Sequence, residues 1–127
     1  MPGLTTAGLT HMLQATLGEA GLTPFDAANS YMGVGDSATA FDASQTDLLG
    51  TNKYRKAVDT GSPSRSGLDT TWVATFGTTE ANFNWQEAGI FNASSGGTML
   101  FRIVWNWGVK TSAVSRQLTL TLSLSAS

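Results

Sequence analysis

The carboxylate of Glu87 is the charged group in this sequence that most invites a chemical role. Glu87 lies in phase with Trp85 and Phe91 in an alternating segment, which predicts that its side chain points inward. A buried carboxylate must be paired or hydrogen-bonded. Arg102, on the expected neighbouring strand, is the candidate partner, although its phase differs from that of the aromatic row. Because no second carboxylate accompanies Glu87 there, we predict a structural ion pair or an acceptor of backbone N–H groups rather than a general acid or base.

Other residues that carry out chemistry are sparse in this chain. His11 is the sole histidine, and no G-x-S-x-G segment accompanies it as a Ser-His-Asp hydrolase would require. The aspartates Asp36, Asp42 and Asp47 occupy one polar stretch, but their spacing does not match a calcium-binding loop, so we interpret them as turn and cap residues. The chain has no cysteine and no paired histidines. The sequence therefore predicts no catalytic residue, no cofactor, no metal site and no enzymatic activity.

The tryptophans offer a different kind of site. Trp105 and Trp107 are two residues apart, and exposed indoles on one strand face would form a platform for stacking sugars. Their phase with Met99, Phe101 and Ile103 instead favours a core, or a core that continues across a subunit boundary. The predicted core or interface aromatics are Trp72, Trp85, Phe91, Phe101, Trp105 and Trp107.

One helix and several strands must position these side chains. Leu9, Met12, Leu13 and Leu17 recur at helical spacing over residues 4–17, with Thr5 or Thr6 as N-cap. We interpret this amphipathic helix as covering the core. An arm or docking helix is the alternative.

The remainder of the chain has the pattern of a β-protein. Short strands are expected at residues 30–35 and 54–58, with loops at 36–50 and 60–67 and a turn over 46–49 capped by Ser44. Four longer alternating strands follow, the last with its leucines at 118, 120, 122 and 124 facing the core. Residues 85–91 and 99–109 are expected to alternate on either side of a hairpin loop. We predict a mainly β (α+β) fold with one domain over residues 1–127: an antiparallel β-sandwich or barrel-like sheet with an N-terminal amphipathic helix.

Composition narrows the classes of partner. The charged fraction is 13%, against about 25% in soluble domains, and the chain carries 13 serines and 18 threonines. Such a surface costs little to desolvate in an assembly. The alternative is an ordinary all-β surface that is rich in threonine. The net charge is −2 with scattered basic residues, which argues against direct nucleic-acid binding. No apolar run approaches the roughly 20 residues of a membrane span. The N-terminus lacks a basic signal-peptide region, so synthesis in a cytoplasm is expected.

Several segments together resemble a family of small virion structural proteins of tailed bacteriophages. The hairpin carries the strongest resemblance, through residues 87–91 (EAGIF) and 98–102 (TMLFR). Further similar segments are residues 31–37 (YMGVGDS), 46–49 (TDLL), 52–56 (NKYRK) and 76–82 (FGTTEAN), and the final Leu/Thr strand. The acidic residue usual in the family before Tyr54-Arg55 is replaced here by Asn52 or Lys53.

The resemblance implies a homo-oligomeric virion component, such as a capsid decoration (cement) protein. Its partners would be further copies of itself, as in a homotrimer, and the major capsid protein or another virion protein. Small size, few charges and a compact β-fold favour decoration of the shell, with the N-terminal segment or the loops at 36–50 and 60–70 contacting it. A tail, baseplate or fibre-base component is the alternative. A carbohydrate-binding β-sandwich that uses Trp105 and Trp107 is a further alternative.

Overall fold

The computed structural model describes residues 3–126, which contain one helix and seven strands arranged in two antiparallel sheets. This confirms the predicted fold class. The four-stranded sheet has the order β2-β1-β5-β6, and the three-stranded sheet has the order β3-β4-β7. The elements are α1 (Thr6–Thr16), β1 (Tyr31–Gly35), β2 (Lys53–Ala57), β3 (Ser64–Ser66), β4 (Asp69–Phe76), β5 (Asn84–Phe91), β6 (Met99–Val109) and β7 (Arg116–Ser123).

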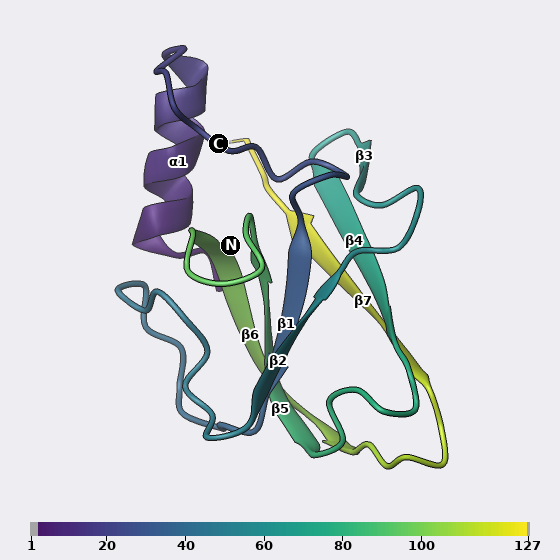
Figure 1. The fold of residues 1–127 in the computed structure, drawn as a ribbon. Coiled ribbons are helices and arrows are strands. Elements are labelled where there is room, and N and C mark those ends of the chain that lie inside the picture. The colour runs from purple at the N-terminus through teal and green to yellow at the C-terminus, as the bar shows by residue number, and fades with distance from the viewer. Residues whose placement is uncertain (1–2, 127) are drawn as a thin grey trace.

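The two sheets pack face to face, and the main core lies between them (Figure 1). In β7 the leucines at 118, 120 and 122 are buried while Thr119 and Thr121 are exposed, as the alternation predicts. Leu124 lies beyond the strand and is exposed, so the expectation that it faces the core was wrong. The side chains of the main core come from both sheets: Met32, Val34, Trp72, Ala74, Phe76, Trp85, Ala88, Ile90, Phe101, Leu118, Leu120 and Leu122.

The pairing of β5 with β6 is interrupted twice, and these irregularities overturn the predicted phase of both strands. Ile90 pairs with Phe101 and Phe91 pairs with Met99, so Leu100 is an additional residue in β6. The additional residue turns Met99 away from the main core, and its partner Phe91 faces the same way by regular alternation after Ile90, so both form a second cluster with Leu48. The expected single row of aromatic and apolar residues in each strand was wrong, because a bulge moves every residue beyond it to the opposite face.

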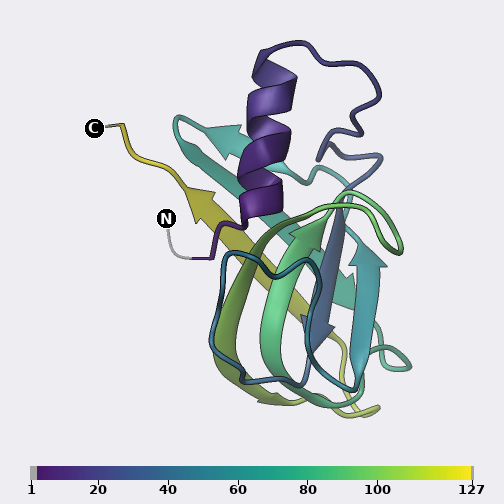
Figure 2. The same cartoon turned by 90° about the vertical axis from the view of Figure 1, so that its left-hand side faces the viewer.

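The helix projects beyond one end of the sandwich instead of covering the core (Figures 1 and 2). Thr5 is its N-cap, and the Thr5 side chain accepts a hydrogen bond from the Gly8 N–H. Met12 packs against the core, but Leu9, Leu13 and Leu17 are exposed, so the expectation of a core-covering face was wrong. Gly8 explains the contact that does form, because a Cβ at Gly8 would collide with the Leu100 carbonyl of β6.

A long connection between β1 and β2, which we call the β1–β2 loop (residues 36–52), crosses the outer face of the four-stranded sheet (Figure 2). The turn expected over 46–49 is absent from this described loop, and Ser44 donates a hydrogen bond to Asp42 instead. Residues 60–67 were expected to be a loop but include β3, which forms a hairpin with β4. The central strands β1 and β5 of the four-stranded sheet are therefore covered on both faces, by the other sheet within and by this loop outside, whereas β2 stays largely exposed.

Candidate functional site

Glu87 and Arg102 form an ion pair on the outer face of the four-stranded sheet, beneath the β1–β2 loop. The Arg102 Nε donates to Glu87 Oε1 at 2.9 Å, and both side chains are completely buried. Glu87 does point away from solvent, but not into the main core with Trp85, because the irregularity between these residues places them on opposite faces. The structure thus brings together the two charged residues that the sequence singled out.

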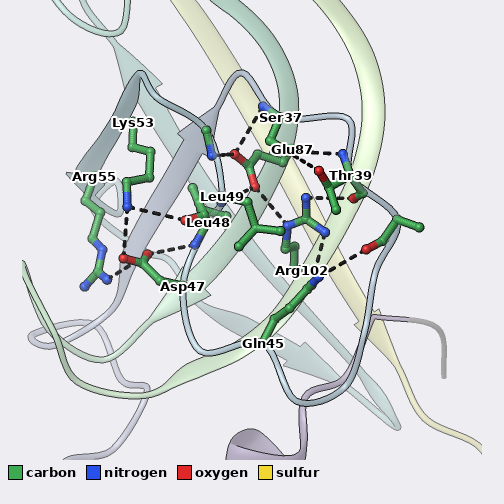
Figure 3. A network of polar contacts seen from close by, with 12 residues as sticks. Ser37, Thr39, Gln45, Asp47, Leu48, Leu49, Lys53, Arg55, Glu87 and Arg102 are labelled. Atoms are coloured by element: carbon green, nitrogen blue, oxygen red, sulfur yellow. Dashed lines mark hydrogen bonds and ion pairs between the residues drawn. The ribbon is translucent and has the colours of Figure 1, made fainter.

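The loop wraps the Glu87 carboxylate with its own backbone (Figure 3). The Leu49 N–H donates to Oε1 at 2.9 Å, and the Gly50 and Ser37 N–H groups donate to Oε2 at 2.7 and 3.3 Å. Room for these contacts comes from Gly35 and Gly50, where a Cβ would collide with the carboxylate or, at Gly50, also with Asp36. Each carboxylate oxygen therefore accepts two hydrogen bonds.

Arg102 binds the same loop from its other side. One terminal nitrogen donates to Gln45 Oε1 at 3.1 Å and the other to the Thr39 carbonyl at 2.9 Å (Figure 3). The ion pair is thus linked to the start, the middle and the end of the loop. Because both charges are buried, with four hydrogen bonds to the carboxylate and three from the guanidinium, the pair is suited to fixing the loop rather than to transferring a proton.

A second, more accessible set of charges joins the β1–β2 loop to the hairpin loop at 92–98. Asp47 accepts from Lys53 at 3.2 Å and from Arg55 at 3.4 Å. Arg55 also donates to the carbonyls of Ala93 and Gly96, and its guanidinium stacks 3.5 Å above the ring of Phe91. Burial acts to raise the pKa of Asp47, but hydrogen bonds from the Leu48 N–H and Lys53 outweigh it, so the pKa is lowered.

These charges border an open cavity of about 430 Å³ between the two loops. Arg55, Asp47 and Lys53 face it, but each already has a partner within the chain. Asp47 lies within eight positions of Lys53 and Arg55, whereas Ala93 and Gly96 lie 38 and 41 positions from Arg55. Only the resemblance of residues 52–56 drew attention to them, and it did not predict Asp47 as their partner.

A third polar contact, which the sequence did not predict, lies near the edge strand β2. The Lys56 ammonium donates to both oxygens of Glu80, at 2.9 and 2.7 Å, and the Tyr54 hydroxyl donates at 3.0 Å. Hydrogen bonds from Lys56 and from the Gly77 N–H lower the pKa of Glu80 to about 2. Glu80 therefore holds the β4–β5 connection against strand β2 of the four-stranded sheet.

The predicted aromatic residues divide into three environments. Trp72, Trp85 and Phe101 lie in the main core, and Phe91 lies in the cluster beneath the β1–β2 loop. Trp107 is partly buried against the core. Trp105 is exposed and contributes nothing to the core of this chain, contrary to the phase argument. The reason is the second irregularity of β5 and β6, where Trp85 pairs with Gly108 but Glu87 pairs with Val104.

The remaining candidate residues have local partners. His11 Nε2 lies 2.9 Å from the Thr23 carbonyl, and its ring packs edge-on against Phe25. Asp36 accepts hydrogen bonds from the side chain and the N–H of Asn52, which lower its pKa, and Asp42 accepts from Ser44. Among residues 3–126 there is no group of three or more acidic or histidine side chains close enough to hold a metal ion. No helix in that range is long and apolar enough to cross a membrane.

No family model matches this chain, and no curated protein matches it. The function must therefore be argued from the geometry of the β1–β2 loop and its buried ion pair.

Proposed function

We propose that this chain is a structural protein of a tailed-phage virion and acts there as a capsid decoration protein that binds the shell as a homo-oligomer. The observation that carries the proposal is the β1–β2 loop held over the sheet by Glu87 and Arg102. A connection of this length without secondary structure is unusual in a small domain unless it has a function. The side chains of Glu87 and Arg102, which hold the loop, are completely buried and out of reach of a substrate, which favours a binding role over catalysis.

The exposed side of the loop is suited to a protein partner. Its exposed residues are small, hydroxylated or apolar apart from one aspartate and one asparagine: Ala38, Thr39, Ala40, Asp42, Ala43, Ser44, Thr46, Leu49, Thr51 and Asn52. Few charges must be desolvated when such a surface is covered. The ion pair has already ordered the backbone, so little further conformational entropy is lost on binding. Fixing a loop in advance is a recognised way to strengthen a contact without enlarging it.

Binding of this kind would stabilise a capsid by linkage, because a ligand that binds the assembled shell and not its free subunits favours assembly. Contacts repeated over a symmetric lattice would add avidity to a weak individual contact. The mechanism needs no reaction and no cofactor.

The stoichiometry of the chain in purified virions, measured by quantitative mass spectrometry against the major capsid protein, tests the proposal. About one copy per capsid subunit is expected for decoration. A few copies per hundred subunits would instead assign the chain to the tail, baseplate or fibre base. Absence from virions would refute a virion role altogether.

A pair of matched variants tests the loop itself. Ala40 in the β1–β2 loop and Ala113 in the β6–β7 connection are both exposed alanines. Ala40→Arg should abolish binding to capsids that lack the protein, whereas Ala113→Arg should bind normally. Equal binding by both variants would exclude the loop from the contact with the shell.

A second candidate function rests on Trp105, which is 66% exposed on β6. An exposed indole is the group that a carbohydrate-binding module uses to stack a sugar ring. Titration with mono- and oligosaccharides, followed by tryptophan fluorescence, tests this function. A shift in emission that Trp105→Ala removes would support sugar binding, and an unchanged spectrum would reject it.

A further inference from the structure

The exposed side of α1 carries a row of three leucines. Leu9, Leu13 and Leu17 follow one another at intervals of four residues, and they are 47%, 66% and 75% exposed. Residues at this spacing lie on the same side of a helix. Met12 and Gly8 occupy the side that faces the sandwich, so the leucines cannot be covered by the chain's own core. We call Leu9, Leu13 and Leu17 the leucine row.

The helix that carries the leucine row has no carboxylate, ammonium or guanidinium group, and the first one along the chain is Glu19, two residues beyond Leu17. Residues 1–18 contain no Asp, Glu, Lys or Arg. Beside the helix lies an open groove of about 530 Å³, which extends this uncharged surface towards the β1–β2 loop and the hairpin loop. Its lining residues are Thr6, Ala7, Thr10, Gln14, Ala43, Ser44, Thr46 and Thr98.

This charge pattern excludes two classes of partner. Nucleic acid is held mainly by Lys and Arg, and helices that lie on anionic membranes carry the same residues on their polar face. The helix has neither. A helix exposed permanently to water would normally carry charged residues on its outer side. The surface is therefore built to meet another uncharged protein surface.

We infer that the leucine row packs against the leucine row of a second copy of this chain. Leucines at i, i+4 and i+8 form a ridge that packs against an identical ridge, the commonest mode of helix packing in globular proteins. A symmetric contact places each residue opposite itself or a neighbour, so it would repel if the surface were charged. The uncharged leucine row and groove meet this requirement of charge complementarity.

The contact must extend beyond the helix. A stable interface needs about 800 Å² from each partner, which is more than three leucine side chains supply. The groove provides additional uncharged surface next to the leucine row, because Ala7, Thr10 and Gln14 of the same helix line it. The inference rests on the proposed function for its biological setting, since it identifies which surface holds the copies of the homo-oligomer together. Ala43, Ser44 and Thr46 of the β1–β2 loop line the groove and would be covered in this contact, which leaves the exposed residues 38–40 of the loop free for the shell.

Sedimentation equilibrium of the purified full chain tests the inference. The wild-type protein should sediment above the protomer mass of 13.3 kDa. Leu13→Gln should weaken association by about 10- to 100-fold, since it removes one buried leucine from each side of the contact. Leu68→Gln is the matched control, because Leu68 is 56% exposed but lies in the β3–β4 turn, and it should associate like the wild type. Circular dichroism should be unchanged in both variants.

Cross-linking tests the geometry directly, because the chain has no cysteine of its own. A disulfide forms only when two Cα atoms approach to about 4.4–6.8 Å. Leu13 is the middle residue of the row, so Leu13→Cys should give a covalent dimer under mild oxidation whether the helices run parallel or antiparallel. Leu9→Cys alone should do so only if they run parallel. Leu68→Cys should remain largely monomeric.

A wild-type protein of 13.3 kDa at every concentration would overturn the inference, as would undiminished association of Leu13→Gln. A monomer in solution whose binding to capsids requires Leu13 would also overturn it and identify the shell as the partner of the leucine row. These outcomes are distinct from failure of the proposed function. A monomeric protein present at one copy per capsid subunit would leave decoration intact, and an oligomer absent from virions would refute decoration alone.

Discussion

Replacement of Glu87 by Gln is the sharpest test of the site, because the two side chains have the same shape. In the wild type, Oε1 accepts from Arg102 and Leu49, and Oε2 accepts from Gly50 and Ser37. A glutamine amide has one acceptor oxygen, and its NH₂ group only donates. Whichever way the amide is turned, its NH₂ group faces two N–H donors, and the buried guanidinium loses its counter-charge.

The expected cost follows from these contacts. A hydrogen bond to a charged group contributes about 1.5–3 kcal/mol, so the loss of two predicts about 3–6 kcal/mol. Removing one partner from a buried ion pair costs about 3–5 kcal/mol in other proteins. We therefore expect Glu87→Gln to lower the free energy of unfolding by about 3–5 kcal/mol. For a domain of this size, that corresponds to a fall in Tm of roughly 12–20 °C.

The assay is urea denaturation followed by the fluorescence of the buried tryptophans, at one protomer concentration because association shifts apparent stability. Hydrogen exchange supplies the local readout, since the amides of Leu49 and Gly50 should lose protection before the amides of β7 do. Glu19→Gln is the control, because Glu19 is exposed and should change stability by less than about 0.5 kcal/mol.

A double-mutant cycle with Arg102→Met decides whether the two residues act as a pair. If they do, the double variant should be destabilised by clearly less than the sum of the two single losses, because neither leaves the other charge unpaired. Strictly additive losses would refute the coupling. A loss below about 1 kcal/mol for Glu87→Gln would refute the argument that this carboxylate holds the β1–β2 loop.

Three further outcomes follow from the same structure. The pKa of Glu80 is lowered to about 2 in the folded chain, so the stability that its carboxylate contributes is complete above its ordinary pKa of 4.5 and is lost as the pH falls towards 2. Urea titrations at pH 6 and pH 3 should therefore show a smaller stability difference between wild type and Glu80→Gln at pH 3. Arg55→Lys should lose at least one of the bonds to the carbonyls of Ala93 and Gly96, speeding hydrogen exchange in the hairpin loop while β7 stays protected; uniform exchange across the chain would contradict this. Gly35→Ala should destabilise the chain by about 1–3 kcal/mol in thermal unfolding, because its Cβ would collide with Glu87, and an unchanged Tm would contradict the tight packing.

The parts of the fold that were predictable are those in which local pattern and environment agree. The leucines of β7 alternate because one face meets the core and the other meets solvent. The sequence limited the N-cap to Thr5 or Thr6, and the structure assigns it to Thr5, whose hydroxyl accepts from the Gly8 N–H one turn away. The pattern failed in β5 and β6, because a bulge is decided by how two distant strands fit together. The residues around Leu100 carry no sequence pattern that predicts the bulge there.

The ion pair was predictable as far as its two members, and no further. Glu87 is a charge within an apolar segment, and Arg102 is the nearest opposite charge across the hairpin. Their other partners are backbone groups of Leu49, Gly50 and Thr39, and any residue type supplies such groups. The composition and the spacing of the residues therefore could not predict where the β1–β2 loop lies. The prediction that the helix covers the core failed for a related reason. The spacing of its leucines predicts an apolar helix face, but it does not show whether that face is covered within the same chain.

Strand β5 is covered on both of its faces, and this limits how its sequence can diverge. Every residue from Glu87 to Phe91 is buried, whereas β7 exposes every second residue. A strand enclosed on both sides offers a mutation no tolerant position, so β5 should change slowly while Thr119 and Thr121 drift freely. Residues 87–91 should thus remain conserved among relatives whose overall sequence identity to this chain is low. A search for distant relatives should weight these five positions, together with Arg102, above the rest of the chain.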